Sequence, residues 1–395
     1  MTNHQRDQVA EFVDQEIEST LKLVERLVNQ ESVEDSAAVD ICLDMIEDAV
    51  SPLAGKHGRP SFDGLSNLVC EWGESNEEHR LLLSAHTDVV PADGIWNSPP
   101  FSLVRGEATL TGRGVCDMKG GLAAFVGALK VVARCGGLCN TPVSLVVTGD
   151  EEVGSARGII PLLREEIVMG TWAVCGEPTS LQIFTGNRGV IWLRVEVHGK
   201  GGHAGMAHTL DNPVVCAAAI IQALNELTFD SYDERFDPTT PCLTVTSLYA
   251  NGRPVVNTVP DVVTIAIDRR LLPGEKPEAA VSHIEQAVAR NVGKPFEARV
   301  LVDRTWPAYI CDASDPFVAV SQEILRTVGR SATLGTDSAA DDSSWLGNAG
   351  ISTILCGPGH PAQAHATDET VSILEIRDAI DIYARLVLAV RDRRL

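Results

Sequence analysis

Short apolar segments alternate with longer segments of helical periodicity along much of this 395-residue chain. Such alternation favours parallel strands joined by crossover helices, because parallel neighbours need a long connection. Residues 6–30 and 36–50 carry Val, Leu and Ile at helical spacing, which predicts two amphipathic helices against one face of a sheet. We therefore expect an α/β fold with a mixed, mostly parallel sheet and helices on both faces. The alternating segments are 67–72, 81–85, 122–132, 143–148, 161–167 and 172–175.

The pattern changes near Arg188 and changes back near Trp306. Between them the order is β-α-β-β-α-β, the ferredoxin-like arrangement, which forms a complete small domain. The sequence thus predicts a catalytic domain in two parts, 1–187 and 304–395, with an inserted module over 188–303. The elements expected in the module are strand 190–197, helix 212–227, strands 242–249 and 262–268, helix 277–291 and strand 296–302.

Composition excludes several classes of protein. A formal charge of −22 argues against a nucleic-acid partner, because phosphate binding needs a basic surface. The ten cysteines are scattered without a close Cys-x-x-Cys pair, and the N-terminal segment lacks the apolar stretch of a signal peptide. No apolar run approaches membrane-spanning length. A cytoplasmic protein with no membrane or nucleic-acid partner is the expectation.

Five acidic or histidine residues follow apolar runs that are typical of buried strands. In an open α/β sheet, ligands bind at the carboxyl ends of the strands, so these side chains can converge although they are far apart in sequence. Two imidazoles and three carboxylates suit a site for two divalent cations, whose charge three carboxylates and a hydroxide would balance. The five residues are His86, Asp117, Glu152, Glu177 and His365.

The His86–Asp88 pair and Asp117 have simpler alternatives. Asp88 lies two residues after His86 at a strand end, so its carboxylate can orient the imidazole, although a solvated pair is also possible. Asp117 lies on a glycine-bounded turn before a helix, where an N-cap is the common role of aspartate. Its two oxygens could equally bridge two cations.

Three consecutive acids, Asp150 to Glu152, follow an apolar strand. A surface acidic loop is the alternative. If the backbone is extended, Glu151 and Glu152 point to opposite sides. We therefore expect Glu152 to be a metal ligand and Glu151 to be a general base that takes a proton from water.

The inserted module contributes three further candidates, His203, Asn257 and Arg269. Each could have a purely structural role. A guanidinium such as that of Arg269 is nevertheless well shaped to bind a substrate carboxylate.

Several motifs together resemble the two-zinc amidohydrolase and metallopeptidase family of acetylornithine deacetylase, succinyl-diaminopimelate desuccinylase, aminoacylase and glutamate carboxypeptidase. The resemblance covers nearly the whole chain and implies the family's zinc-peptidase-like fold with a lid and dimerisation domain. The motifs are Ser-Ala-His-Thr-Asp-Val-Val-Pro, Gly-Arg-Gly-Val-Cys-Asp-Met-Lys-Gly-Gly, Gly-Asp-Glu-Glu-Val-Gly-Ser, Gly-Glu-Pro-Thr, His-Gly-Lys-Gly-Gly-His-Ala-Gly and Ala-His-Ala-Thr-Asp-Glu.

By this resemblance, Asp117 bridges two metal ions. His86 and Glu177 complete one metal position, and Glu152 and His365 complete the other. His360 competes with His365 for the ligand role, but only His365 lies in the family's Ala-His-x-x-Asp-Glu setting.

The resemblance also assigns roles around the metals. Asp88 supports His86, Glu151 shuttles the proton, and His203 of the lid reaches the active site of the partner subunit in a homodimer to stabilise the oxyanion. Asn257 and Arg269 contact the substrate, Arg269 at its carboxylate.

The expected function is metal-dependent hydrolysis of an amide bond in an N-acyl amino acid or small peptide. Two Zn²⁺ ions are expected, with Co²⁺ or Mn²⁺ as alternatives, since the same ligands accept all three. A dipeptidase or carboxypeptidase of the same family and a non-catalytic ligand-binding homologue are the competing hypotheses. A cysteine hydrolase using Cys116 or Cys175 has little support, because both resemble small apolar neighbours of the ligands.

Overall fold

The computed structural model describes residues 3–33, 37–73, 79–250 and 255–392, so residue 36 of the second predicted helix lies outside them. The chain divides into two compact units. Unit 1 comprises Met1–Gly186, Ile310–Thr336 and Asp341–Leu395, and unit 2 comprises Asn187–Tyr309 and Asp337–Ala340. The sequence predicted boundaries after residues 187 and 303.

A nine-stranded sheet forms the centre of unit 1, with the order β1-β4-β8-β5-β9-β19-β10-β17 and β18 paired to β10. Its four middle strands are parallel: β8 (Val143–Thr148), β5 (Leu81–His86), β9 (Trp172–Pro178) and β19 (Ser352–Gly357). Every residue of β5, β8 and β9 is buried, as expected for strands covered on both faces. The flanking strands β4 and β10 run antiparallel to their neighbours, so the predicted mixed, mostly parallel sheet is confirmed.

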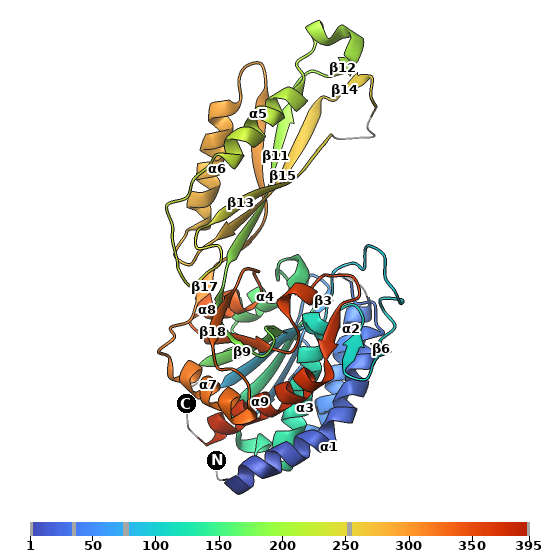
Figure 1. Ribbon diagram of the computed structural model, residues 1–395, viewed down its shortest axis with the longest axis vertical. Coiled ribbons are helices and arrows are strands. Elements are labelled where there is room, and N and C mark those ends of the chain that lie inside the picture. Colours follow the sequence, from blue (N-terminus) through green and yellow to red (C-terminus); the bar gives the residue numbers. More distant parts are fainter. Residues whose placement is uncertain (1–2, 34–36, 74–78, 251–254, 393–395) are drawn as a thin grey trace. The chain divides into compact units, whose positions relative to one another are not determined.

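Helices cover both faces of this sheet (Figure 1). On one face α1 (Asn3–Val28), α3 (Gly120–Arg134) and α9 (Ile373–Arg391) pack against one another. On the other, α4 (Ile159–Arg164) and α8 (Ser343–Asn348) join one apolar cluster with the strands. The remaining elements of unit 1 are α2 (Ala37–Val50), η1 (Ser51–Leu53), β1 (Lys56–Gly58), β2 (Ser61–Phe62), β3 (Leu65–Ser66), β4 (Leu68–Trp72), β6 (Val104–Arg105), β7 (Thr109–Thr111), η2 (Val115–Lys119), η3 (Leu138–Asn140), η4 (Glu151–Val153), β10 (Ile183–Asn187), β17 (Tyr309–Ile310), α7 (Pro316–Val328), β18 (Leu334–Asp337), η6 (Pro361–Gln363) and β20 (Thr370–Ser372).

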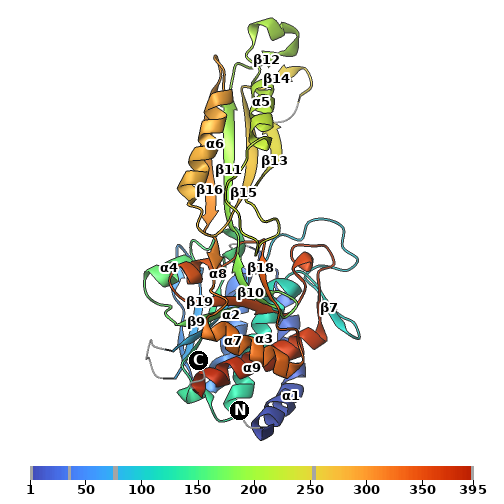
Figure 2. The same ribbon diagram turned by 60° about the vertical axis from the view of Figure 1, so that its left-hand side comes forward.

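Unit 2 is a four-stranded antiparallel sheet with two helices packed against it (Figure 2). Its strand order β13-β15-β11-β16 is that of a ferredoxin-like fold, in which the first and third strands lie in the middle. Alternate residues of β11 are buried, and their apolar side chains form a core with the helices. The elements are β11 (Gly189–His198), α5 (Pro213–Asn225), β13 (Cys242–Ala250), β15 (Val262–Leu271), α6 (Pro277–Asn291) and β16 (Glu297–Trp306), with the short β12 (Gly202–His203), η5 (Ala204–Thr209) and β14 (Thr258–Val259).

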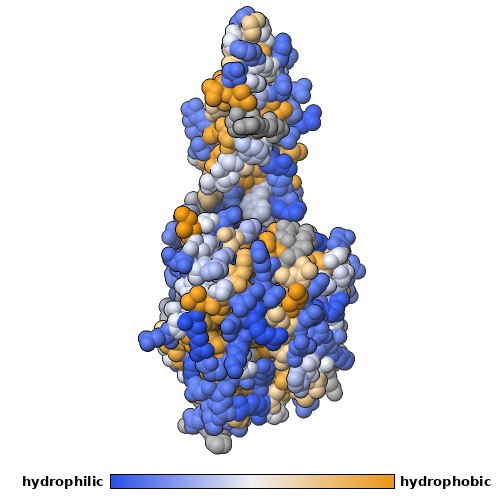
Figure 3. All heavy atoms as spheres, turned by 90° about the vertical axis from the view of Figure 1, so that its right-hand side faces the viewer, coloured by the Kyte–Doolittle hydropathy of each residue, from blue (hydrophilic) through white to orange (hydrophobic). Residues whose placement is uncertain are grey.

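The surface displayed in Figure 3 intersperses hydrophilic and hydrophobic residues on both units. Within the described part of the chain, no helix combines the length and apolar character that crossing a bilayer requires. All ten cysteines are described and free of disulfides.

Candidate metal centre

The five predicted ligands come together at the carboxyl ends of the parallel strands of unit 1. His86 is the last residue of β5, and Glu177 is the penultimate residue of the neighbouring β9. Glu152 lies in η4, directly after β8, and His365 lies in the loop after β19. Asp117 lies in η2, the irregular turn that precedes α3. The fold thus delivers each side chain from a different segment to one edge of the sheet.

Asp117 lies between two groups of potential ligands. Its Oδ1 is 3.1 Å from Nε2 of His86, which is 3.6 Å from Oε1 of Glu177. Its Oδ2 is 3.4 Å from Nε2 of His365, which is 3.0 Å from Oε2 of Glu152. In each group of three, one ligand atom per residue lies within 4.8 Å of the others. The two carboxylate oxygens of Asp117 therefore face different groups.

Glu151 is buried beside these groups. Its Oε2 is 4.0 Å from Nε2 of His86, and a third possible group combines His86, Glu151 and Glu152. The backbone here is a 3₁₀ turn, not the extended strand from which the separation of the two glutamates was predicted. The premise of an extended backbone at these two glutamates was wrong, because the strand β8 ends at Thr148, before the acidic residues begin.

Asp88 links the two groups. Nδ1 of His86 lies 2.9 Å from the backbone carbonyl oxygen of Asp88 and 3.5 Å from its carboxylate Oδ1. The other carboxylate oxygen accepts a hydrogen bond from the backbone N–H of Glu152 at 3.0 Å. The closest orienting contact of the imidazole is therefore the carbonyl, and the carboxylate also fixes the turn that carries Glu152.

Burial and crowding of like charges disturb the titration of these groups. Burial, together with the charge of Asp117, raises the pKa of Glu177 well above its usual range. Burial and the neighbouring Glu152 and Glu177 likewise raise the pKa of Glu151, against the lowering effect of His86. Hydrogen bonds to Asp117 and Glu152 raise the pKa of His365 to about 10.

The donor set fits divalent cations. Three carboxylates and two imidazoles converge on a small volume, buried around His86, while the His365 side chain is 53% exposed; the repulsion among the carboxylates needs positive charge to offset it. Oε1 of Glu152 is buried without a hydrogen-bond partner among the described residues, so one oxygen remains free to bind a ligand. Imidazole and carboxylate donors suit Zn²⁺, Co²⁺ and Mn²⁺.

His203 and Asn257 lie together in unit 2. The pairing of β12 with β14 places His203 opposite Thr258, and the N–H of Ala204 donates to the backbone oxygen of Asn257 at 2.9 Å. The exposed His203 side chain accepts one local hydrogen bond, from the N–H of Gly205. The structure therefore brings together two candidates that are far apart in sequence.

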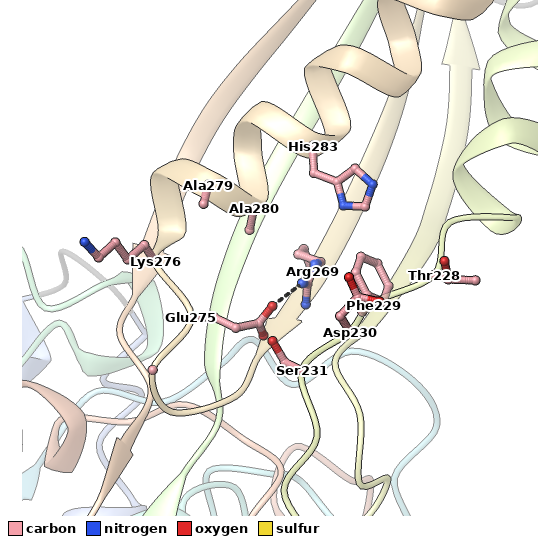
Figure 4. Close-up of a pocket in the computed structure, with 11 residues that line it drawn as sticks. Thr228, Phe229, Asp230, Ser231, Arg269, Glu275, Lys276, Ala279, Ala280 and His283 are labelled. Atoms are coloured by element: carbon pink, nitrogen blue, oxygen red, sulfur yellow. Dashed lines mark hydrogen bonds and ion pairs between the residues drawn. The ribbon is translucent and has the colours of Figure 1, made fainter.

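Arg269 lies elsewhere in unit 2 and is already engaged. Its side chain is 2% exposed, donates to Glu275 at 2.8 Å and stacks on Phe229 at 4.0 Å. It lines a hollow of about 430 Å³ between α6 and the 228–231 segment (Figure 4). Arg270 lies on the opposite face of β15 and bonds to Asp268. The guanidinium of Arg269 is therefore already paired and is not free to bind a substrate carboxylate.

His360, the alternative to His365 as a ligand, and the two candidate cysteine nucleophiles lie in environments that do not suit those roles. His360 caps η6 by accepting a hydrogen bond from the N–H of Ala362, whereas His365 contacts two of the carboxylates. Burial raises the pKa of the thiols of Cys116 and Cys175 above the usual range, which opposes a nucleophilic thiolate.

Two residues around the centre escaped sequence reasoning although they lie in the quoted motifs. Arg113 and Glu369 form a buried ion pair of 2.7 Å. Glu369 also accepts a hydrogen bond from the N–H of Asp117. The signal in the sequence was a charged residue inside each motif: Arg113 in the glycine-rich motif and Glu369 in the histidine-containing motif.

Residues 82–389 match the peptidase family M20/M25/M40. The chain belongs to this family. The predicted family resemblance and the prediction of a hydrolase that acts on amide bonds are thereby confirmed.

Curated relatives and solved structures agree with this assignment. The chain is 31% identical over 331 residues to a succinyl-diaminopimelate desuccinylase of Gluconacetobacter diazotrophicus, covering 80% of this chain and 82% of that protein. It is 27% identical to the enzyme of the same name from Thioalkalivibrio sulfidiphilus, covering 93% and 98%.

The solved structures share the fold. The dipeptidase Dug1p of Saccharomyces cerevisiae has a TM-score of 0.83 at 16% identity, covering 99% of both chains. The M20 metallo-carboxypeptidase Sso-CP2 of Sulfolobus solfataricus has a TM-score of 0.80 at 19% identity, covering 94% and 99%. A third, the Bacillus subtilis YXEP protein, is described as a dinuclear metal-binding peptidase, with a TM-score of 0.70, 15% identity and coverage of 96% and 99%.

Proposed function

We propose that this M20 protein hydrolyses the amide bond of an N-acyl amino acid with two divalent metal ions, most simply Zn²⁺. The observation that carries the proposal is the pair of three-residue ligand groups that share Asp117. His86 and Glu177 would hold one ion, and Glu152 and His365 the other. Paired ions lower the pKa of a water molecule and polarise an amide carbonyl when bound.

Glu151 is proposed as the general base. It is buried next to the ligands, and its raised pKa makes it a better proton acceptor near neutral pH than an ordinary carboxylate. It would take the proton of the attacking water and deliver it to the leaving amine. Asp88 would hold His86 and the Glu152 turn in place.

Unit 2 is proposed to contribute substrate contacts. His203 would donate a hydrogen bond to the oxyanion that forms on the scissile carbonyl, and the adjacent Asn257 would contact the substrate. For Arg269 to bind a substrate carboxylate, its guanidinium would have to give up its contacts with Glu275 and Phe229.

Deacylation is favoured over dipeptide cleavage because the relatives at 31% and 27% identity are desuccinylases. The dipeptidases resemble this chain at 16% identity, which supports the fold alone. The test is amine release from matched N-acyl amino acids and dipeptides by zinc- and cobalt-reconstituted protein, with metal-free protein as the control. Faster cleavage of dipeptides would favour the peptidase hypothesis, and no turnover of either class would favour a non-catalytic homologue.

A homodimer through unit 2 is part of the proposal. Leu248 and Tyr249 on the edge strand β13, and Val302 on the opposite edge strand β16, expose 43%, 44% and 47% of their surface. Unpaired strand edges with apolar side chains are ready to pair with another chain. Light scattering would detect the dimer, and Leu248→Asp should weaken it.

A cytoplasmic location is proposed because all ten cysteines are free.

A further inference from the structure

The ion pair between Arg113 and Glu369 is nearly inaccessible to solvent, with side chains 3% and 1% exposed. Neither residue belongs to the ligand groups. A buried ion pair is weak evidence for stability, because removing both charges from water is costly. The pair is better explained by the backbone groups that it holds in place.

The Glu369 carboxylate accepts four hydrogen bonds. Oε1 accepts from the backbone N–H groups of Cys116 at 2.8 Å and Asp117 at 3.0 Å. Oε2 accepts from the N–H of Gly114 at 3.0 Å and from Nη1 of Arg113 at 2.7 Å. The carboxylate therefore fixes the backbone of the turn that presents Asp117, the residue shared by both ligand groups.

The Arg113 guanidinium binds two other loops. It donates to the backbone oxygen of Ala366 at 3.1 Å and to that of His365 at 3.3 Å. It also donates to Pro91, three residues beyond Asp88, at 3.4 Å. The flat fork of an arginine can make such divergent bonds at once, whereas the single ammonium of a lysine cannot.

We propose that Arg113 and Glu369 are positioning residues that set the separation of Asp117 from His365 and thereby the affinity for the second metal ion. The inference rests on the proposed two-metal centre. It differs from a purely structural role, because the pair ties together three segments that carry or adjoin proposed ligands, namely the turn at Asp117, the loop at His365 and the loop at Pro91. Loss of such outer contacts typically lowers metal affinity about 10–100-fold.

The test is equilibrium dialysis of metal-free protein against Zn²⁺, combined with the visible spectrum of the cobalt-substituted protein. Glu369→Gln preserves shape but turns an amide NH₂ toward backbone N–H donors. We expect its second metal ion to bind about 10–100-fold more weakly, with an altered cobalt spectrum. Arg113→Lys keeps the charge and should show a smaller loss.

Asp381→Asn is the matched control. Asp381 forms another buried ion pair, with Arg385 on α9, in which both side chains are 6% exposed. This variant should lower the melting temperature without changing metal affinity or the spectrum. A folded Glu369→Gln protein with wild-type affinity and spectrum would overturn the inference. If Glu369→Gln does not fold, wild-type affinity in Arg113→Lys overturns it equally. Failure of the wild type to bind two ions would instead refute the proposed function.

Discussion

The candidate metal centre of unit 1 and the His203–Asn257 region of unit 2 are built in opposite ways. The His86 side chain is 1% exposed and Asp88 is 0% exposed, and their loops are joined by hydrogen bonds between distant segments. His203 is exposed and makes one local side-chain bond. The difference teaches that most of the proposed ligands are held in place by contacts between distant segments, with only His365 exposed among them, whereas the His203 side chain is held by a local contact.

Glu151→Gln should have the largest effect on the preorganised side of this comparison. Turnover should fall about 10²–10⁴-fold, because a positioned base is lost, while metal content stays at the wild-type value. Steady-state kinetics and metal analysis measure the two quantities. The exposed Glu107→Gln is the control and should leave both unchanged. Wild-type turnover in Glu151→Gln would remove the base role.

His203→Ala probes the exposed region. We expect turnover to fall about 10²–10³-fold, as for loss of an oxyanion donor, with metal content and melting temperature unchanged. His208→Ala, also exposed in the same segment, is the control. Mixing His203→Ala with Glu151→Gln subunits should restore partial activity if the histidine acts across a dimer. Hybrids that stay inactive would contradict action in trans.

Asp88→Ala tests whether one carboxylate supports both ligand groups. It removes the acceptor of the Glu152 N–H and the contact near His86, so zinc affinity should fall about 10–100-fold. Competition with a chelating dye gives the affinity. Thr87→Val changes a side chain bonded to Thr148 instead and should not alter zinc binding. Wild-type zinc affinity in Asp88→Ala would mean that Asp88 has no such role.

Arg269→Ala distinguishes packing from substrate binding. Because Glu275 would lose its partner and Phe229 its stacked guanidinium, we expect unit 2 to lose about 3–5 kcal/mol of stability. Denaturant unfolding measures this loss. Unchanged stability with a raised KM would instead restore the predicted carboxylate contact.

The smallest expected effect is the pH dependence of zinc binding that follows from the protonation of His365. Its pKa of about 10 means that the imidazole is protonated at neutral pH without metal, so zinc binding must release protons. Apparent affinity should rise with pH, which calorimetry in buffers of different ionisation enthalpy detects. Since the folded pKa lies above the unfolded value of about 6.5, the stabilisation of metal-free protein is complete below that pH and is lost as pH rises through about 10. Zinc binding without proton release would refute this protonation state.

Sequence periodicity predicted the elements better than the directions of particular side chains. The strands ending near His86 and Glu177 and the order of unit 2 were predictable, because long apolar and helical patterns reflect burial. Strand alternation also contained an unused signal. Val263, Ile265 and Ile267 are buried in the core of unit 2, so Arg269 falls on the same covered face. No comparable pattern in the sequence indicated the 3₁₀ turn at Glu151.

The sequence alone determined the residue types of the proposed ligands, the strands that end at or near His86 and Glu177, and the family-level chemistry, since these depend on local pattern and on residue identity. Tertiary structure decided that the two oxygens of Asp117 face different ligand groups and that Glu369 holds its backbone. It also decided that Arg269 is enclosed by Glu275 and Phe229. The physical reason is that such contacts join segments far apart in the chain, and only the packing of the folded protein sets their distances.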